Sequence, residues 1–311
     1  MSVLWQVNIV TLLADALFDL DCPVIINEQN APRKNLESLW QKHLFWPLAR
    51  KIYKQAKKVV AISNVIAAEL QKTLSLSFEK FKVIHNPIVL DEIHKKSSFT
   101  SEALPTTYPR LVAVGRLMPQ KSYPLLLKAL RIVITEKPVH LYVLGEGTER
   151  SYLERLIENL DLKPFIHLLG FQSNPYAYMR QADIFVLSSD YEGFGNVIVE
   201  AMALGLPVIA TDCPYGPREI LADGKYGLLV PPGDEEALAK AILSLLREPD
   251  TRRRLGRKAK KRAEDFSVEK IIPHSIRAVV FRPDRQPNLT MCGRNLLNLE
   301  LWHRMFMDKT S

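Results

Sequence analysis

The chain has 311 residues, 47% of them hydrophobic and 24% charged, with a formal net charge of +8. This is an ordinary soluble globular composition, and the length is enough for about two domains with substantial cores. The three cysteines, Cys22, Cys213 and Cys292, have no short metal-ligand spacing, and their odd number argues against a disulfide framework, so the reducing cytoplasm fits best.

Residues 1–26 are apolar enough to raise the question of a signal peptide or a membrane anchor. They lack a basic amino-terminal region, and Asn8, Asp15, Asp19 and Asp21 interrupt the apolar run. The segment is therefore interpreted as a buried helix followed by a strand.

Three strand-like runs precede residue 90, with helical stretches between them. The runs cover residues 24–29, 57–63 and 81–87, and helices are expected over residues 36–54 and 64–73. This pattern is half of a Rossmann-like domain whose beginning is missing. Residues 90–109 contain few large apolar side chains and are expected to form a linker. The predicted amino-terminal domain spans residues 1–97.

Strand-like and helical runs alternate from Arg110 onward. The strand-like runs are residues 111–115, 140–145, 165–170, 183–189, 207–211 and 227–231. Such alternation predicts a parallel sheet covered by helices. The helix after the last strand is expected to begin with Asp234, a good N-cap residue. The result is one doubly wound domain, predicted to span residues 98–270.

Residues 188–219 hold two glutamates, Glu192 and Glu200, around a Gly-Phe-Gly turn. The runs on either side predict a strand, a glycine loop and a helix. A helix N-terminus presents unpaired N–H groups, so Asn196 and Val197 can donate to a phosphate. The carboxylates would be repelled by that phosphate but accept hydrogen bonds from hydroxyl groups. A nucleotide-sugar satisfies both requirements; the alternative is that both glutamates are solvated surface residues.

Two cations, Arg116 and Lys121, follow the strand over residues 111–115. They leave the carboxyl end of a central strand, where open α/β sheets bind ligands. Fixed cations there would stabilise the negative charge that builds on a diphosphate when it leaves a sugar. A purely structural role is disfavoured, because positive charge at a helix N-terminus opposes the helix dipole.

The stretch EGFGNVIVEAMALGLPVIA, residues 192–210, resembles the Glu-x7-Glu signature of the family 4 retaining glycosyltransferases. The similarity extends over roughly residues 5–268, and AISNVIAAEL and VIHNP match the end of the family's amino-terminal domain. The resemblance implies an α/β fold of the GT-B type, in which two Rossmann-like doubly wound domains face each other over a cleft. The amino-terminal domain is expected to be incomplete, because family members have several strands before the equivalent of Trp5.

The resemblance also implies residue roles. Arg116 and Lys121 would stabilise the departing diphosphate and Glu192 would bind hydroxyls of the donor sugar, so these three are the expected catalytic residues. Glu200 would bind the ribose, and the loop at Gly170 and Phe171 would contact the base. The expected donor-binding residues are Gly115, Gly170, Phe171, Gly193, Phe194, Gly195, Asn196, Val197 and Glu200.

The activity implied by the resemblance is retaining transfer of a hexosyl or acetamidohexosyl group from a UDP-sugar to a glycan or lipid-linked acceptor. The stretch TDCPYGPREI, residues 211–220, resembles a subset of the family that builds surface polysaccharide or glycolipid. No metal or other cofactor is expected, because Arg and Lys take the place of a metal. The alternative is a noncatalytic nucleotide-sugar-binding remnant of such an enzyme.

Residues 251–262, TRRRLGRKAKKR, carry eight basic residues and no acidic one, which equals the net charge of +8. Such a cluster is most often a solvated helix face, and the functional alternative is attraction to anionic lipid headgroups or RNA. No aromatic side chain lies among the arginines, which argues against nucleic acid as a partner. We expect a cytoplasmic protein, with an anionic membrane surface at the inner face of the cytoplasmic membrane as a candidate partner.

Residues 271–311 match nothing in the family, and Pro273, Pro283 and Pro287 would break any long helix there. The expectation is an atypical tail, altered by a frameshift or readthrough near Ile271. A reading frame that begins internally at Met1 would account for the missing strands, whose loss exposes one edge of the amino-terminal sheet.

Overall fold

Residues 5–18, 24–29, 39–99, 104 and 107–272 are described by a computed structural model. Their contacts divide the chain into a first unit within Met1–Asn86 and a second unit, Pro87–Lys270. The expectations for the tail beyond residue 272, and for Cys22 and Cys292, lie outside the described residues. No helix among the described residues is long and apolar enough to cross a membrane.

The first unit contains a parallel sheet of three described strands in the order β1-β2-β3. The strands are β1 (Ile25–Glu28), β2 (Lys58–Ala61) and β3 (Phe81–Val83), with helices α1 (Trp5–Phe18), α2 (Leu39–Tyr53) and α3 (Asn64–Leu74) and a 3-10 turn, η2 (Phe78–Lys80). The Ser63 hydroxyl caps α3 by accepting from the amide of Ile66 at 3.2 Å. The three strands and two helices predicted before residue 90 are confirmed, as is the helix within residues 1–26. That helix was expected to be buried, but it is only partly so, because Val10 and Leu17 are exposed.

A buried polar cluster joins both neighbouring helices to the end of β1. Asn8 of α1 donates to Glu28 Oε1 at 2.7 Å, and the hydroxyl of Tyr53 in α2 donates to the same oxygen. Burial raises the pKa of Glu28 to about 7, although these two hydrogen bonds lower it. Because all three side chains are buried, the cluster holds the end of β1 against α1 and α2 by hydrogen bonding as well as by packing.

The second unit contains a six-stranded parallel sheet in the order β6-β5-β4-β7-β8-β9. The strands are β4 (Arg110–Val114), β5 (His140–Leu144), β6 (Ile166–Gly170), β7 (Ile184–Leu187), β8 (Val208–Thr211) and β9 (Leu228–Val230). Every residue of β7 and β8 is buried, as expected when helices cover both faces of a sheet. The strand order reverses between β4 and β7, which is the topological switch point where such sheets bind ligands.

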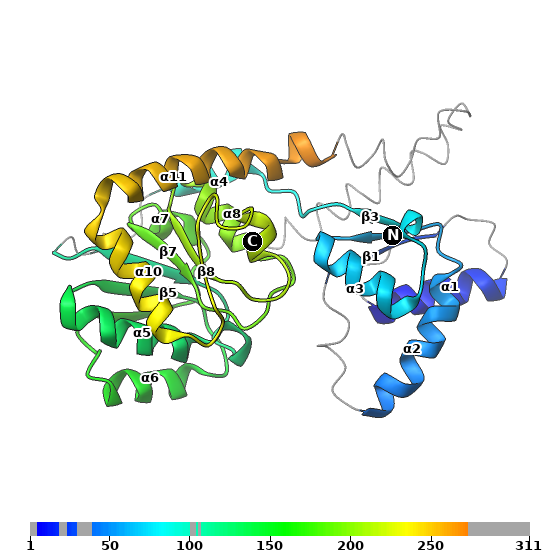
Figure 1. Ribbon diagram of the computed structural model, residues 1–311, viewed down its shortest axis with the longest axis horizontal. Helices are drawn as coiled ribbons and strands as arrows, with labels where there is room; N and C mark the ends of the chain where they lie inside the picture. Colours follow the sequence, from blue (N-terminus) through cyan, green and yellow to red (C-terminus); the bar gives the residue numbers. More distant parts are fainter. Residues whose placement is uncertain (1–4, 19–23, 30–38, 100–103, 105–106, 273–311) are drawn as a thin grey trace. The chain divides into compact units, whose positions relative to one another are not determined.

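Helices cover the two faces of this sheet in two layers (Figure 1). On one face lie α5 (Tyr123–Glu136), α6 (Arg150–Asn159) and α10 (Glu235–Arg247); on the other lie α4 (Leu90–Ser97), α7 (Pro175–Met179), α8 (Asn196–Ala203) and α11 (Pro249–Ala263). Short turns complete the unit: η3 (Pro119–Lys121), α9 (Pro217–Ile220) and η4 (Glu264–Phe266). The predicted N-cap of α10 is confirmed, because Asp234 Oδ1 accepts from the amide of Ala237 at 2.8 Å. The predicted doubly wound sheet is therefore confirmed.

The helix α4 corrects the prediction for residues 90–109. Residues 90–97 are helical and belong to the second unit, so the linker prediction was wrong for them. Asp91 and Glu92 lie in the first turn, where acidic side chains favour a helix, and Ile93 is buried. The end of α4 is tied to α7 because the side chain of Asn174 donates to the carbonyl of Lys96 at 2.8 Å. The buried side chain of Ile93, the acidic first turn and the hydrogen bond to Asn174 together explain why this polar segment is helical.

Candidate donor site at the switch point

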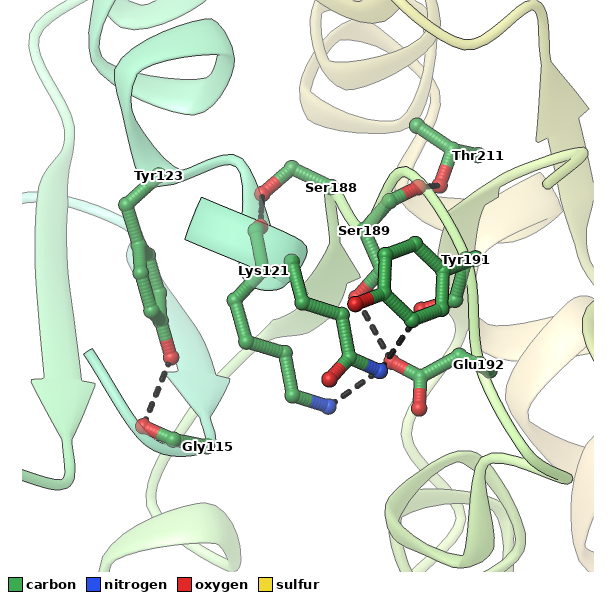
Figure 2. Close-up of polar contacts among 9 residues, drawn as sticks. Gly115, Lys121, Tyr123, Ser188, Ser189, Tyr191, Glu192 and Thr211 are labelled. Atoms are coloured by element: carbon green, nitrogen blue, oxygen red, sulfur yellow. Dashed lines mark hydrogen bonds and ion pairs between the residues drawn. The ribbon is translucent and has the colours of Figure 1, made fainter. Parts of the chain in front are cut away.

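The loops that follow β4 and β7 meet at the switch point of the second unit. The Ser188 hydroxyl donates to the carbonyl of Lys121 at 2.9 Å (Figure 2). The amide of Asp190 donates to the carbonyl of Gln120 at 2.9 Å, and the Gln120 side chain donates to the carbonyl of Tyr191 at 2.8 Å. Three hydrogen bonds therefore fix the loop that carries Lys121 against the loop that carries Glu192.

Lys121 and Glu192 form an ion pair at this junction. Lys121 Nζ lies 2.7 Å from Glu192 Oε1, and the Ser189 hydroxyl donates to the same oxygen at 2.6 Å (Figure 2). The side chains of Lys121 and Glu192 are only 16% and 7% exposed, so water screens the pair weakly. Among the described residues both bonds end on Oε1, which leaves Oε2 able to accept from a hydroxyl group of a ligand.

The position of Ser189 is itself set by the next strand. Thr211, the last residue of β8, donates its hydroxyl hydrogen to the carbonyl of Ser189 at 2.5 Å. The amide of Glu192 donates to the carbonyl of Pro214 at 3.2 Å. The sequence predicted Glu192 but not Ser189 or Thr211, because hydroxyl residues at strand ends carry no spacing signal of their own.

Two glycines next to this pair, Gly115 and Gly145, allow close approaches that a side chain would hinder. The Lys121 side chain passes over Gly115, where an added Cβ would lie 3.0 Å from Lys121 Cε. The hydroxyl of Tyr123 holds the Gly115 carbonyl at 3.0 Å. A Cβ at Gly145 would lie 2.0 Å from that same carbonyl oxygen. Gly115 thus gives the Lys121 side chain room to pass, and the close approach of Gly145, just after β5, to the Gly115 backbone requires a glycine there, which the sequence did not single out.

The loop before α8 is held in a similar way. Gly195 has a φ of 94° and begins α8, and a Cβ at Gly216 would lie 1.7 Å from the Phe194 carbonyl oxygen. Phe194 itself is 2% exposed and packs edge-on against Phe266 at 5.7 Å between ring centroids. Of the predicted site residues, Phe194 therefore contributes its backbone, while its ring belongs to the core. Gly216 is a further residue that sequence reasoning missed.

Glu200 lies on α8, one turn after Asn196, and is partly buried. Burial raises the pKa of its carboxyl to about 7. Burial and the charge of Glu200 also raise the pKa of the Tyr176 hydroxyl. No hydrogen-bond partner for the Glu200 carboxylate is found within the described parts of the chain, which leaves its oxygens for a ligand.

The remaining predicted residues lie at neighbouring strand ends. Arg116 follows β4 and is exposed, with no ion pair to any described residue, and Phe171 follows β6 with 74% of its surface exposed. Gly170 ends β6 with a φ of 73°. The structure thus brings Gly115, Lys121 and Glu192 together, whereas Arg116 and Phe171 lie at the same edge of the sheet as free side chains.

Two family models match consecutive parts of the chain. The model described as "Glycosyltransferase Family 4" matches residues 5–92, and the model described as "Glycosyl transferases group 1" matches residues 94–262. The second match alone covers more than half of the 311 residues. The chain belongs to the glycosyltransferases of these families, and its fold is of the GT-B type.

Curated relatives carry the same family name. The chain is 32% identical over 269 residues, 85% of this chain and 71% of the relative, to the N-acetylgalactosamine-N,N'-diacetylbacillosaminyl-diphospho-undecaprenol 4-alpha-N-acetylgalactosaminyltransferase of Campylobacter jejuni. It is 32% identical over 180 residues to the lipopolysaccharide core biosynthesis glycosyltransferase LpsE of Rhizobium meliloti, covering 58% of this chain and 52% of LpsE. These relatives support the classification of the chain as a glycosyltransferase.

Solved structures share the fold. HepE of Anabaena in complex with UDP has a TM-score of 0.76 and 24% identity over 88% of this chain and 77% of that chain. TarM of S. aureus in complex with fondaparinux, alpha-GlcNAc-glycerol and UDP has a TM-score of 0.65 and 22% identity over 76% of this chain and 47% of that chain. At these identities the likeness concerns the fold.

Proposed function

We propose that the chain transfers a hexosyl or acetamidohexosyl group from a UDP-sugar to a glycan or lipid-linked acceptor, with retention of anomeric configuration. The product would belong to a cell-surface polysaccharide or glycolipid. The observation that carries the proposal is the buried pair of Lys121 and Glu192 at the switch point, with one carboxylate oxygen left free.

In this proposal the cation of the pair, Lys121, acts on the diphosphate, and the anion, Glu192, binds the sugar. Lys121, held in place by Glu192, and the exposed Arg116 at the same strand end would stabilise the diphosphate as its bond to the sugar breaks, because both cations lie where negative charge would develop. Glu192 Oε2 would accept from a sugar hydroxyl, while Ser189 and Lys121 hold Oε1. No metal is part of this proposal, since the two side-chain cations carry out the neutralisation.

The nucleotide half of the donor would lie along α8. The glycine loop at Gly193 and Gly195 gives a phosphate access to the amides of Asn196 and Val197, and Glu200 would accept from the ribose hydroxyls. Phe171 would contact the base with its exposed ring. UDP is supported as the nucleotide by the complexes of HepE and TarM, and a lipid-linked acceptor by the diphospho-undecaprenol in the name of the Campylobacter relative.

The first test replaces Glu192 with glutamine, which has nearly the same shape but no charge. We expect transfer of radiolabelled sugar from UDP-sugars to extracted lipid acceptors to fall by at least about a hundredfold, because a hydroxyl anchor and the partner of Lys121 are lost together. Glu236→Gln, an exposed substitution in the first turn of α10, is the matched control and should leave transfer unchanged.

The same assay separates the enzyme from a noncatalytic remnant. Calorimetric binding of UDP without transfer from any UDP-hexose or UDP-acetamidohexose would support the remnant. Unchanged transfer in Glu192→Gln would refute the role given to Glu192. The anomeric proton coupling of the product, measured by NMR, tests retention; inversion would contradict that part of the proposal.

A further inference from the structure

The outward face of α11 is formed by basic residues. Gly256, Ala259 and Ala263 are the buried residues of this helix. On the opposite side lie Arg254, Arg257, Lys258 and Lys261, which are exposed and follow the i, i+3, i+4, i+7 spacing of a single helix face. We call these four residues the α11 basic face.

Other cations of the same helix already have partners. Arg253 pairs with Asp250 at 2.6 Å, and Arg262 pairs with Asp265 at 3.0 Å. Arg262 also donates to the carbonyls of Glu219 and Ile220. Among the described residues none of the four members of the α11 basic face has a counter-ion. Structural demands on α11 therefore explain the paired cations but not these four.

Positive charge continues beside this face. Lys260 lines a cavity of about 290 Å³ together with His94 at the end of α4 and Arg180 at the end of α7. A cation near a helix C-terminus is favoured by the helix dipole, which accounts for the position of Arg180 at the end of α7. The cavity thus places Arg180, at the end of α7, and His94, in α4, next to Lys260 of α11 in the same helix layer of the second unit.

We propose that the α11 basic face docks this glycosyltransferase on an anionic phospholipid surface. The proposal rests on the proposed lipid-linked acceptor, which would be reached at a membrane. Basic side chains are attracted to anionic headgroups, and the four unpaired cations supply that attraction without an inserted apolar segment. An RNA partner fits less well, since the α11 basic face has no aromatic side chain for base stacking.

The test is flotation of the full chain with lipid vesicles. Vesicles of phosphatidylcholine are compared with vesicles that also contain phosphatidylglycerol, and binding is expected only to the second, with loss at high salt. Replacing Arg254, Arg257, Lys258 and Lys261 with glutamine should weaken this binding by about a hundredfold or more.

The matched control removes the same charge away from the α11 basic face, by replacing Arg131 of α5, Arg155 of α6, Lys240 of α10 and Lys163 of the loop after α6 with glutamine. The control should bind vesicles like the parent chain. Equal loss in both variants, or no binding of the parent chain to anionic vesicles, would overturn the proposal. Binding of an RNA oligonucleotide that is lost in the α11 variant, without vesicle binding, would assign the face to RNA instead.

Failure of this proposal is distinguishable from failure of the proposed function. UDP binding and transfer to a soluble acceptor do not need a membrane, so both should be retained by the α11 variant. A chain that transfers sugar but ignores vesicles refutes the docking surface alone, whereas a chain that floats with vesicles but never transfers sugar refutes the activity alone.

Discussion

At the residue scale, Ser189 decides how Glu192 is presented. Its hydroxyl donates to Glu192 Oε1 at 2.6 Å, and the residue is buried. We predict that Ser189→Ala lowers kcat roughly tenfold to a hundredfold, because a buried hydrogen bond to a charged group is lost and the carboxylate can rotate. The effect should fall on kcat more than on UDP affinity, measured by steady-state kinetics and calorimetry.

Two variants separate this positioning role from simple loss of stability. Ser189→Thr retains a hydroxyl group and should recover most of the lost rate. Ser244→Ala removes an exposed hydroxyl that bonds only within α10 and should have no effect on transfer. A rate loss in Ser189→Ala that Ser189→Thr does not rescue, or that accompanies an equal loss of UDP binding, would contradict the assignment.

Glu200 leads to a prediction about pH. Burial raises the pKa of its carboxyl to about 7, so the free protein holds a proton there at mildly acidic pH. Ribose hydroxyls donate best to the ionised form, so UDP binding should lower this pKa and release a proton. UDP affinity should therefore rise with pH between about pH 6 and 8, and calorimetry in buffers of different ionisation enthalpy should detect proton release.

Glu200→Gln provides the control, since glutamine does not titrate. In this variant UDP affinity should change with pH only as the terminal phosphate of UDP ionises, near its second pKa of about 6, and the proton release attributed to Glu200 should be absent. Proton uptake by the parent chain on binding UDP would show that the ligand favours the neutral carboxyl, contrary to the prediction.

The sequence was sufficient to propose the charged residues of the candidate site but not their mutual arrangement. Glu192 and Glu200 could be recognised from their spacing around Gly193 and Gly195, and Lys121 from its place after a strand. That Lys121 and Glu192 touch depends on β4 and β7 being neighbours, which the order of the strands along the chain does not reveal. Ser189 and Thr211 contribute through ordinary hydroxyl groups, and only their distances identify them.

At the element scale, Gly216 sets the position of the loop that begins α8. A Cβ there would lie 1.7 Å from the Phe194 carbonyl oxygen, so Gly216→Ala must displace the loop. We predict a loss of at least about 3 kcal/mol in the free energy of unfolding, measured by chemical denaturation, together with reduced UDP affinity.

Gly233→Ala is the matched control for this substitution. Gly233 also has a positive φ, 79°, but a Cβ added there would have no neighbouring atom within 4 Å. It should lose only about 1 kcal/mol through backbone strain and bind UDP normally. Equal effects of the two substitutions would show that backbone conformation, rather than the close approach to Phe194, is the cause.

Elements with strong hydrophobic periodicity could be predicted, whereas α4, a short polar helix held by tertiary contacts, could not. The buried strands β7 and β8 are continuous apolar runs, and α10 has both a cap at Asp234 and an apolar face. In contrast, α4 has a polar sequence and is stabilised by Ile93 and by packing against α7 and α8. Such tertiary stabilisation of a short helix leaves little trace in local sequence.

At the scale of the whole molecule, the residues proposed to bind the donor all belong to the second unit. Residues 87–270 have their own sheet and a continuous core that includes Leu126, Leu141 and Ile242. We predict that this segment, expressed alone, folds and binds UDP within about threefold of the full chain but transfers no sugar. Circular dichroism and calorimetry test the folding and the binding.

The Glu192→Gln substitution in the same segment checks that any transfer observed comes from this site. A folded segment that does not bind UDP, beside a full chain that does, would show that the first unit supplies part of the donor site. Transfer by the segment alone would show that the first unit is dispensable for the acceptor.

The pairing of β4 with β7 has a consequence for how this site comes into being. Lys121 and Glu192 are 71 positions apart, and β5 and β6 lie between them in the chain. Closing so long a loop costs conformational entropy before any contact compensates for it. A chain in which β4 has paired with β5, and β5 with β6, already presents Lys121 but not the carboxylate of Glu192. The proposed donor site is therefore complete only once β7 has paired with β4, and a chain without that pairing would hold the cation of the Lys121 and Glu192 pair but not the anion.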